Sequence, residues 1–251
     1  MRFLITALLI GCTQEEPRVQ GKVVDIWGQP VQDALVIVVG QHNRPTTDAE
    51  GRYWIPRDEG SWEMKAGAEG YIPAFSTVDV TAQTGQLPTL QLWPKPTESG
   101  FYLVGPGTYE TLEPQPVLSK GNTLKMHRGL DAVGEAAHRG PNLKVLFHTD
   151  LKQDQINRLG LELTRMEFIR EAEIPAAVST KVALNLYVAS QSIPLQVTPL
   201  PSRSDYLLEV AELEAGTYAL HTQDILDDMP TEVFEQLPKE HRLAWGLQVV
   251  R

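Results

Sequence analysis

The chain has a single cysteine, Cys12, among its 251 residues. An intrachain disulfide is therefore excluded, and an apolar core has to hold the fold together. Apolar residues make up 42% of the sequence, which is enough to build such a core. Glycine (19 residues) and proline (18 residues) are frequent and scattered, a pattern typical of many turns between short strands. We therefore expect a mainly β fold.

The cysteine closes a short apolar segment at the start of the chain. Met1 and Arg2 give a basic start, residues 3–10 are apolar except for Thr6, and Gly11 follows. Eight residues span about 12 Å as a helix, well short of the roughly 30 Å hydrocarbon core of a bilayer. The segment is too short for a transmembrane helix and is typical of a secretion signal.

The end of this segment resembles a bacterial lipobox, in which branched apolar and small residues precede a cysteine. The matching residues are Leu9, Ile10, Gly11 and Cys12. The resemblance implies that residues 1–11 are a lipoprotein signal peptide and that fatty acids such as palmitate are attached to Cys12. Two or three acyl chains give stable membrane anchoring. Residues 12–17 would be a polar tether, and Thr13, rather than aspartate, favours the outer membrane of the cell envelope.

Two alternatives for the start of the chain stay open. The segment could be an ordinary signal peptide, or a buried N-terminal strand with a chance cysteine. In the lipoprotein reading the only thiol is acylated, so thiol chemistry is excluded.

Length and charge limit the organisation and the partners. About 240 residues would remain after cleavage, more than one typical domain, so we expect two domains. Residues 94–100 contain two prolines and are predicted to be a linker between a first domain, 18–93, and a second, 101–251. The formal net charge of -10 argues against a nucleic-acid partner, which would require a basic surface.

The first predicted domain alternates β-branched runs with turn residues. Residues 19–25 and 31–39 flank a Gly/Pro turn, and a second turn at 48–51 leads into another strand. In that strand Tyr53 and Ile55 face the same side because side chains alternate with period two.

This segment resembles the carboxypeptidase regulatory-like domain, a transthyretin-like β-sandwich. The matching residues are Gly21, Val23, Asp25, Gly28, Pro30, Val31, Ala34, Val36, Thr47, Asp48, Gly51, Tyr53, Ile55, Gly70 and Tyr71. The resemblance implies a sandwich of about seven strands and a module that accompanies peptidases, transport receptors and adhesins. It carries over no catalytic residue, and a fold by itself does not define a function.

Four aromatic residues of this domain are candidate ligand-facing groups: Trp27, Trp54, Trp62 and Tyr71. Exposed rings could stack on sugar faces, but rings that pack in or rim a sandwich are commoner. We expect Asp25 and Asp48 to cap turns rather than bind metal, because their surroundings do not match a calcium loop.

The second half is predicted to be a β-rich domain with a few short helices, and it resembles no family that we recognise. Expected strands lie within residues 101–109, 143–147, 159–163, 182–188, 195–197, 206–210, 215–221 and 244–250, and the Gly-Thr-Tyr elements at 107–109 and 216–218 are expected to be tight turns that lead into a strand. Expected helices are residues 131–139, 150–158 and 230–237.

No catalytic motif is found in this half. The sequence has no Gly-x-Ser-x-Gly elbow, His-Glu-x-x-His pair, P-loop or dinucleotide fingerprint, so we predict no catalytic residue and no cofactor. The best metal candidates are His127, His138, His148 and Asp150, whose spacing matches no known motif. A second group, Asp224, Asp227, Asp228 and Glu232, is more typical of a solvated face and a helix start than of a cation site.

These observations favour a non-enzymatic, lipid-anchored protein of the bacterial cell envelope. It would be a binding or assembly module for another protein or a glycan. The alternative is an envelope hydrolase or metal-binding protein with a site in the second domain. A purely structural spacer is a third hypothesis. A cleft that holds the histidines would favour the enzyme, whereas an aromatic surface would favour binding.

Overall fold

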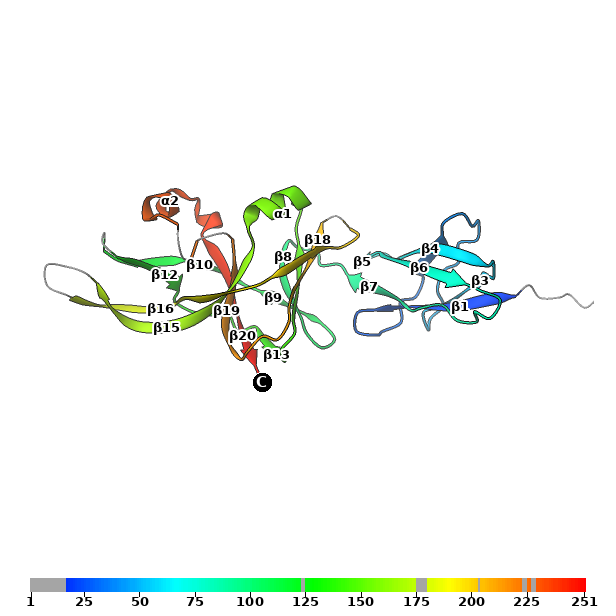
Figure 1. Ribbon diagram of the computed structural model, residues 1–251, viewed down its shortest axis with the longest axis horizontal. Helices are drawn as coiled ribbons and strands as arrows, with labels where there is room; N and C mark the ends of the chain where they lie inside the picture. The colour runs from blue at the N-terminus through cyan, green and yellow to red at the C-terminus, as the bar shows by residue number, and fades with distance from the viewer. Residues whose placement is uncertain (1–16, 123–124, 175–179, 203, 223–224, 227–228) are drawn as a thin grey trace, which may run out of the picture. The chain divides into compact units, whose positions relative to one another are not determined.

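The structure is a computed structural model that describes residues 17–122, 125–174, 180–202, 204–222, 225–226 and 229–251 (Figure 1). The chain divides into two compact units, Met1–Pro94 and Lys95–Arg251, called unit 1 and unit 2 below. The fold is mainly β, as the sequence predicts. Within these described ranges there are two α-helices, of seven and six residues. None of the helices in the described ranges has the length and apolarity needed to cross a bilayer.

Unit 1 is a β-sandwich. Its strands are β1 (Arg18–Asp25), β2 (Leu35–Val38), β3 (Arg52–Pro56), β4 (Gly60–Gly67), β5 (Tyr71–Ile72), β6 (Ala74–Val80) and β7 (Leu90–Pro94). One sheet has the strand order β3-β1-β7-β5 and the other has the order β2-β4-β6. Strands β1 and β7 pair in parallel, and the other pairs in these sheets are antiparallel.

Period-two alternation fills the core of unit 1. On β4, Trp62, Met64 and Ala66 are buried while the residues between them are exposed. On β3, Tyr53 and Ile55 are fully buried, which confirms that they share a face. The core also requires Gly21, because a Cβ atom there would lie 2.1 Å from the Tyr53 ring.

Unit 2 contains two larger sheets. The five-stranded sheet has the order β17-β18-β14-β8-β9, and the eight-stranded sheet has the order β10-β20-β19-β15-β16-β12-β11, with β13 beside β20. The bounds are β8 (Gly100–Val104), β9 (Tyr109–Leu112), β10 (Pro114–Pro116), β11 (Leu118–Gly121), β12 (Met126–Leu130), β13 (Ala137–Arg139), β14 (Leu143–His148), β15 (Glu162–Ile174), β16 (Thr180–Ile193), β17 (Gln196–Pro199), β18 (Asp205–Val210), β19 (Gly216–His221) and β20 (Leu243–Val250). The helices are α1 (Gln153–Leu159), α2 (Thr231–Gln236) and a 3-10 turn, η1 (Lys239–His241).

The eight-stranded sheet is buried on both faces at β19, one of its strands. Tyr218 and Leu220 belong to the larger core, which includes the inner face of the five-stranded sheet. Ala219, which points the other way, belongs to a second cluster that contains Phe234 of α2. Alternate residues of one strand therefore support two cores, and α2 covers the second core.

Two of the three expected helices are present, and the third is not. Helix α1 begins where the Gln155 side chain accepts the Lys152 backbone N–H (2.9 Å), and it ends at Gly160, which is left-handed. Residues 131–139 form no helix: they are an irregular segment that ends in β13. Gly134 lies against the backbone of Gly246, where an added Cβ atom would be 3.0 Å from a carbonyl oxygen, so tertiary packing overrides the local preference.

The segment 101–109 contains a turn, as expected: β8 ends at Val104, the Gly105 N–H donates to the Thr108 carbonyl (3.0 Å), and β9 begins at Tyr109. One expected strand boundary needs correction. Residues 159–163 are not one strand, because Leu159 ends α1 and β15 begins at Glu162.

Candidate functional site

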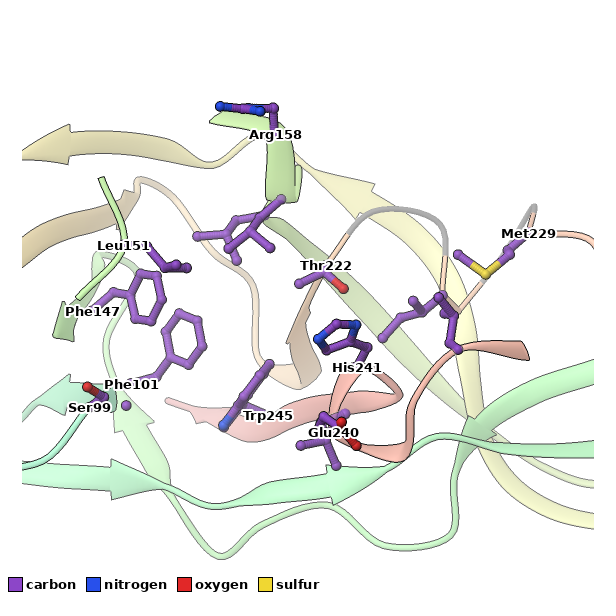
Figure 2. A pocket seen from close by; sticks show the side chains of 16 residues that line it. Ser99, Phe101, Phe147, Leu151, Arg158, Thr222, Met229, Glu240, His241 and Trp245 are labelled. Carbon is purple, nitrogen blue, oxygen red and sulfur yellow. The ribbon is translucent and has the colours of Figure 1, made fainter. Parts of the chain in front are cut away.

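The candidate site is an apolar cavity of about 510 Å³ within unit 2 (Figure 2). Three aromatic rings line it. Phe101 and Phe147 are stacked, with ring centroids 4.2 Å apart and planes 10° from parallel. Trp245 lies beside them, with its ring centroid 4.6 Å from that of Phe101. Figure 2 shows the stacked pair at one end of the cavity and Met229 toward the other.

Strand pairing brings these rings together. Phe101 of β8 and Phe147 of β14 are direct register partners, so their side chains emerge on the same face of the five-stranded sheet. Trp245 comes from β20 of the eight-stranded sheet, where it is register partner of Leu220. Because these strands are far apart in the sequence, the site exists only after both sheets of unit 2 have formed.

Aliphatic side chains complete the walls. They come from α1 and the segments that flank it, and from the segments around α2 and η1: Leu151, Leu159, Leu161, Ile225, Met229, Leu237 and Leu243. The charged or titratable side chains of the lining, those of Arg158, Glu240 and His241, belong to exposed residues. Arg158 pairs with Asp154 one helical turn earlier, so its charge is already compensated. An apolar lining with few polar groups suits the binding of an apolar ligand or side chain.

The predicted metal candidates are not brought together. His127 lies on β12, His138 on β13 and His148 on β14, and Asp150 is an exposed residue after β14. Across the described ranges, no group of three or more His, Cys, Asp or Glu could hold a metal ion. Burial lowers the pKa of His127, with a further decrease from the charge of Lys125. Burial also lowers the pKa of His138, against the effect of a hydrogen bond with the Asn142 backbone.

His148 instead forms a buried pair with Asp205. Its Nδ1 atom lies 2.7 Å from Asp205 Oδ1, and the two side chains are 10% and 0% exposed. They are register partners on β14 and β18, so the sheet fixes their separation. Sequence reasoning missed Asp205 because its partner is 57 residues away and only the strand register reveals it. The burial of both groups indicates a structural pair.

The candidate aromatic residues of unit 1 do not share one environment. Trp62 is only 4% exposed and packs in the core, so it does not face a ligand. Tyr71 is half-buried and packs against the same core, and Trp27 is half-buried. Trp54 is 42% exposed on β3, with the Arg52 guanidinium 5.8 Å from its ring centroid. Of the four residues, Trp54 alone has an exposed ring.

Asp25 and Asp48 of unit 1 cap turns, as predicted. The Asp25 carboxylate accepts the backbone N–H groups of Trp27 (2.9 Å) and Gln29 (2.8 Å). The Asp48 carboxylate accepts those of Glu50 (3.0 Å) and Arg52 (2.8 Å). Burial alone would raise the pKa of Asp48, but the hydrogen bonds and charge of Arg52 hold that pKa below its ordinary value. Capping explains both carboxylates without a metal.

Several predicted residues lie outside the described residues. They are Cys12, Asp224, Asp227 and Asp228. Glu232, the remaining member of that acidic group, is exposed in the first turn of α2.

Comparison with known families adds one finding. Residues 18–92 match the family model of the carboxypeptidase regulatory-like domain, in agreement with the resemblance predicted for 18–93. The β-sandwich of unit 1 is the architecture that this resemblance implies. This is a regulatory, non-catalytic type of domain. Residues 18–92 of the chain are therefore a carboxypeptidase regulatory-like domain.

Proposed function

We propose that the protein is a non-enzymatic, lipid-anchored binding module of the bacterial cell envelope, and that unit 2 holds apolar side chains of a partner protein. The single observation that carries the binding role is the apolar cavity of unit 2, with its stacked Phe101–Phe147 pair. Its volume of about 510 Å³ is within the roughly 300–1,000 Å³ range of ligand pockets.

The chemistry of the lining supports a protein ligand over a glycan. The hydroxyl groups of a sugar would need several polar partners within the cavity. The walls are instead aromatic and aliphatic, and the ionisable residues among them are exposed. Burying one side chain of the size of Leu or Phe contributes about 2 kcal/mol, so a few such contacts give useful affinity. The exposed Trp54 in unit 1 is the residue that would favour a glycan.

The arrangement of the histidines supports binding rather than catalysis. The candidate histidines His127, His138 and His148 are absent from the lining of this cavity, and the histidine that does line it, His241, is an exposed residue. The membrane anchor is supported by the sequence from Leu9 to Cys12, which resembles a lipobox.

Titration with the neutral dye N-phenyl-1-naphthylamine tests the binding role. The dye should bind the full chain saturably with a rise in fluorescence, because its aromatic rings can lie against the apolar walls of the cavity. Leu243→Gln, which places an amide in the lining, should weaken dye binding about tenfold. Leu118→Gln is the matched control, since Leu118 is also a half-buried strand leucine but lies outside the lining. Non-saturable binding, or equal weakening by both substitutions, would overturn the proposal.

A further inference from the structure

Arg128 is a buried cation with unsatisfied donors. The residue lies on β12 and is 6% exposed. Its Nη2 atom donates to the Met229 carbonyl, and its guanidinium carbon lies 4.7 Å from the centroid of the Phe234 ring. The Nε and Nη1 atoms are buried and have no hydrogen-bond partner. In the part of the chain that the structure describes, Arg128 makes no ion pair.

Such an arrangement is unusual in a folded protein. Buried charges are normally paired and buried donors normally have acceptors, because each unmet group forfeits its hydration. The π face of the Phe234 ring attracts the guanidinium and offsets part of this cost. The ring has no oxygen or nitrogen atom that could accept a hydrogen bond from Nε or Nη1. The chain has 32 acidic residues and a net charge of -10, so carboxylates are not scarce. An acceptor from outside the chain would satisfy the unused donors.

Arg128 lines a cavity that has room for such an acceptor. The cavity has a volume of about 340 Å³ and lies between β12, β16 and the segment that leads into α2. Its charged side chains are basic: Arg128, the exposed Lys125 and, beside them, the ionisable His127. Asn122 and Thr231 add polar groups to the lining, which includes no acidic residue among the described ones. Arg128, which has two unpartnered donors, therefore lines this cavity together with a second positively charged side chain.

We propose that this cavity is a binding site for an oxyanion, the carboxylate or phosphate group of a small ligand, and that Arg128 is its principal donor. Guanidinium groups are well suited to these anions because their N–H groups match the geometry of planar and tetrahedral oxygens. The exposed Lys125 adds a second positive charge to the lining. The site goes beyond the proposed function, because it differs in chemistry from the apolar cavity; Met229 lies in the lining of both.

Titration of the full chain with inorganic phosphate or acetate, at constant ionic strength, tests the site. The side-chain Nε–H resonance of Arg128 in an ¹⁵N-labelled sample should shift saturably. Saturation with phosphate alone would identify a phosphate ligand, and saturation with acetate would identify a carboxylate. A resonance that does not respond to either anion would overturn the proposal.

Substitutions at two arginines distinguish anion binding at this site from a general effect of the protein's charge. Arg128→Gln should weaken anion binding at least tenfold, and Arg128→Lys, which keeps the charge, should weaken it less. Arg242→Gln is the matched control, because the Arg242 guanidinium also lies over Phe234 (5.4 Å) but does not line the cavity. Binding should be unchanged in this control, and equal weakening in Arg128→Gln and Arg242→Gln would contradict the proposal. If Arg128→Gln fails to fold, the comparison of Arg128→Lys with Arg242→Lys decides in the same way.

Two carboxylates of the chain itself could occupy the anion site in place of an external ligand, and this alternative can be tested directly. Asp227 and Asp228 precede Met229 in the sequence and lie outside the described residues. The double substitution Asp227→Asn/Asp228→Asn should leave the phosphate affinity unchanged within about twofold. A tenfold rise would show that these carboxylates fill the site, and would overturn the proposal of an external ligand.

Discussion

The hydroxyl group of Tyr53 is buried in the core of unit 1 without a hydrogen-bond partner. Burial raises the pKa of this residue above its ordinary value of 10.0. A buried hydroxyl that makes no hydrogen bond costs about 1–3 kcal/mol relative to an apolar group of the same shape. The sequence predicts the inward orientation of Tyr53 from its alternation with Ile55, but it does not reveal that the hydroxyl lacks a partner.

Tyr53→Phe should therefore increase the stability of unit 1 by about 1 kcal/mol or more in urea unfolding at neutral pH. The difference should grow just above pH 10, because the unfolded chain then loses the tyrosine proton while the folded chain keeps it. Wild-type stability falls with pH in this window, and the variant should lose less. A variant less stable than wild type by more than 1 kcal/mol would show that the hydroxyl has an acceptor.

The His148–Asp205 pair gives a second residue-scale prediction. His148→Ala leaves the fully buried Asp205 carboxylate without its imidazole partner, so we expect a loss of about 3 kcal/mol or more. The Lys144–Glu209 pair joins the same two strands at a solvent-exposed position. Lys144→Ala should cost less than about 1 kcal/mol, and urea unfolding of both variants measures the contrast. Similar losses would argue against a special role for burial.

At the scale of elements, the close approach of β12 and β16 depends on Gly129. A Cβ atom at this position would lie 2.1 Å from the Tyr187 carbonyl oxygen on the neighbouring strand. Gly129→Ala should force the strands apart and destabilise unit 2 by about 3 kcal/mol. Because Arg128 precedes Gly129, phosphate binding should weaken as well.

Gly105→Ala is the control for this prediction. Its added Cβ atom would meet only an ordinary contact, 3.4 Å from the Thr108 carbonyl oxygen, in the turn between β8 and β9. Hydrogen exchange of the β12 amides should be faster than in the wild type for Gly129→Ala and unchanged for Gly105→Ala. Unchanged protection of β12 in Gly129→Ala would contradict the strand-separation account.

Local sequence patterns predict elements where local and tertiary preferences agree. Strands β18, β19 and β20 coincide with predicted strand segments, α2 lies within a predicted helical segment, and α1 overlaps the segment 150–158 and ends one residue after it. The helix expected at 131–139 failed because Gly134 packs on the Gly246 backbone, a contact more than 100 residues away in the sequence. No periodicity within the segment encodes that contact.

For the whole molecule, the sequence predicts the nature of unit 1 better than the site of unit 2. The turn and strand residues of 18–92 are close together in the sequence, so a family pattern captures them. The apolar cavity combines Phe101, Phe147 and Trp245 from three strands, and the burial of Arg128 depends on Phe234 of α2. The apolar cavity requires the pairing order of both sheets and the Arg128 cavity that of the eight-stranded sheet, and alternation alone specifies neither.

The proposed function of the whole molecule requires an anchor that holds both units at a membrane. The measurement that tests it most directly is mass spectrometry of the amino-terminal peptide of the protein isolated from its natural membranes. We predict a chain that begins at Cys12 and carries a thioether-linked diacylglycerol and an amide-linked fatty acid. A terminus that retains residues 1–11, or a processed Cys12 without fatty acid, would contradict the account.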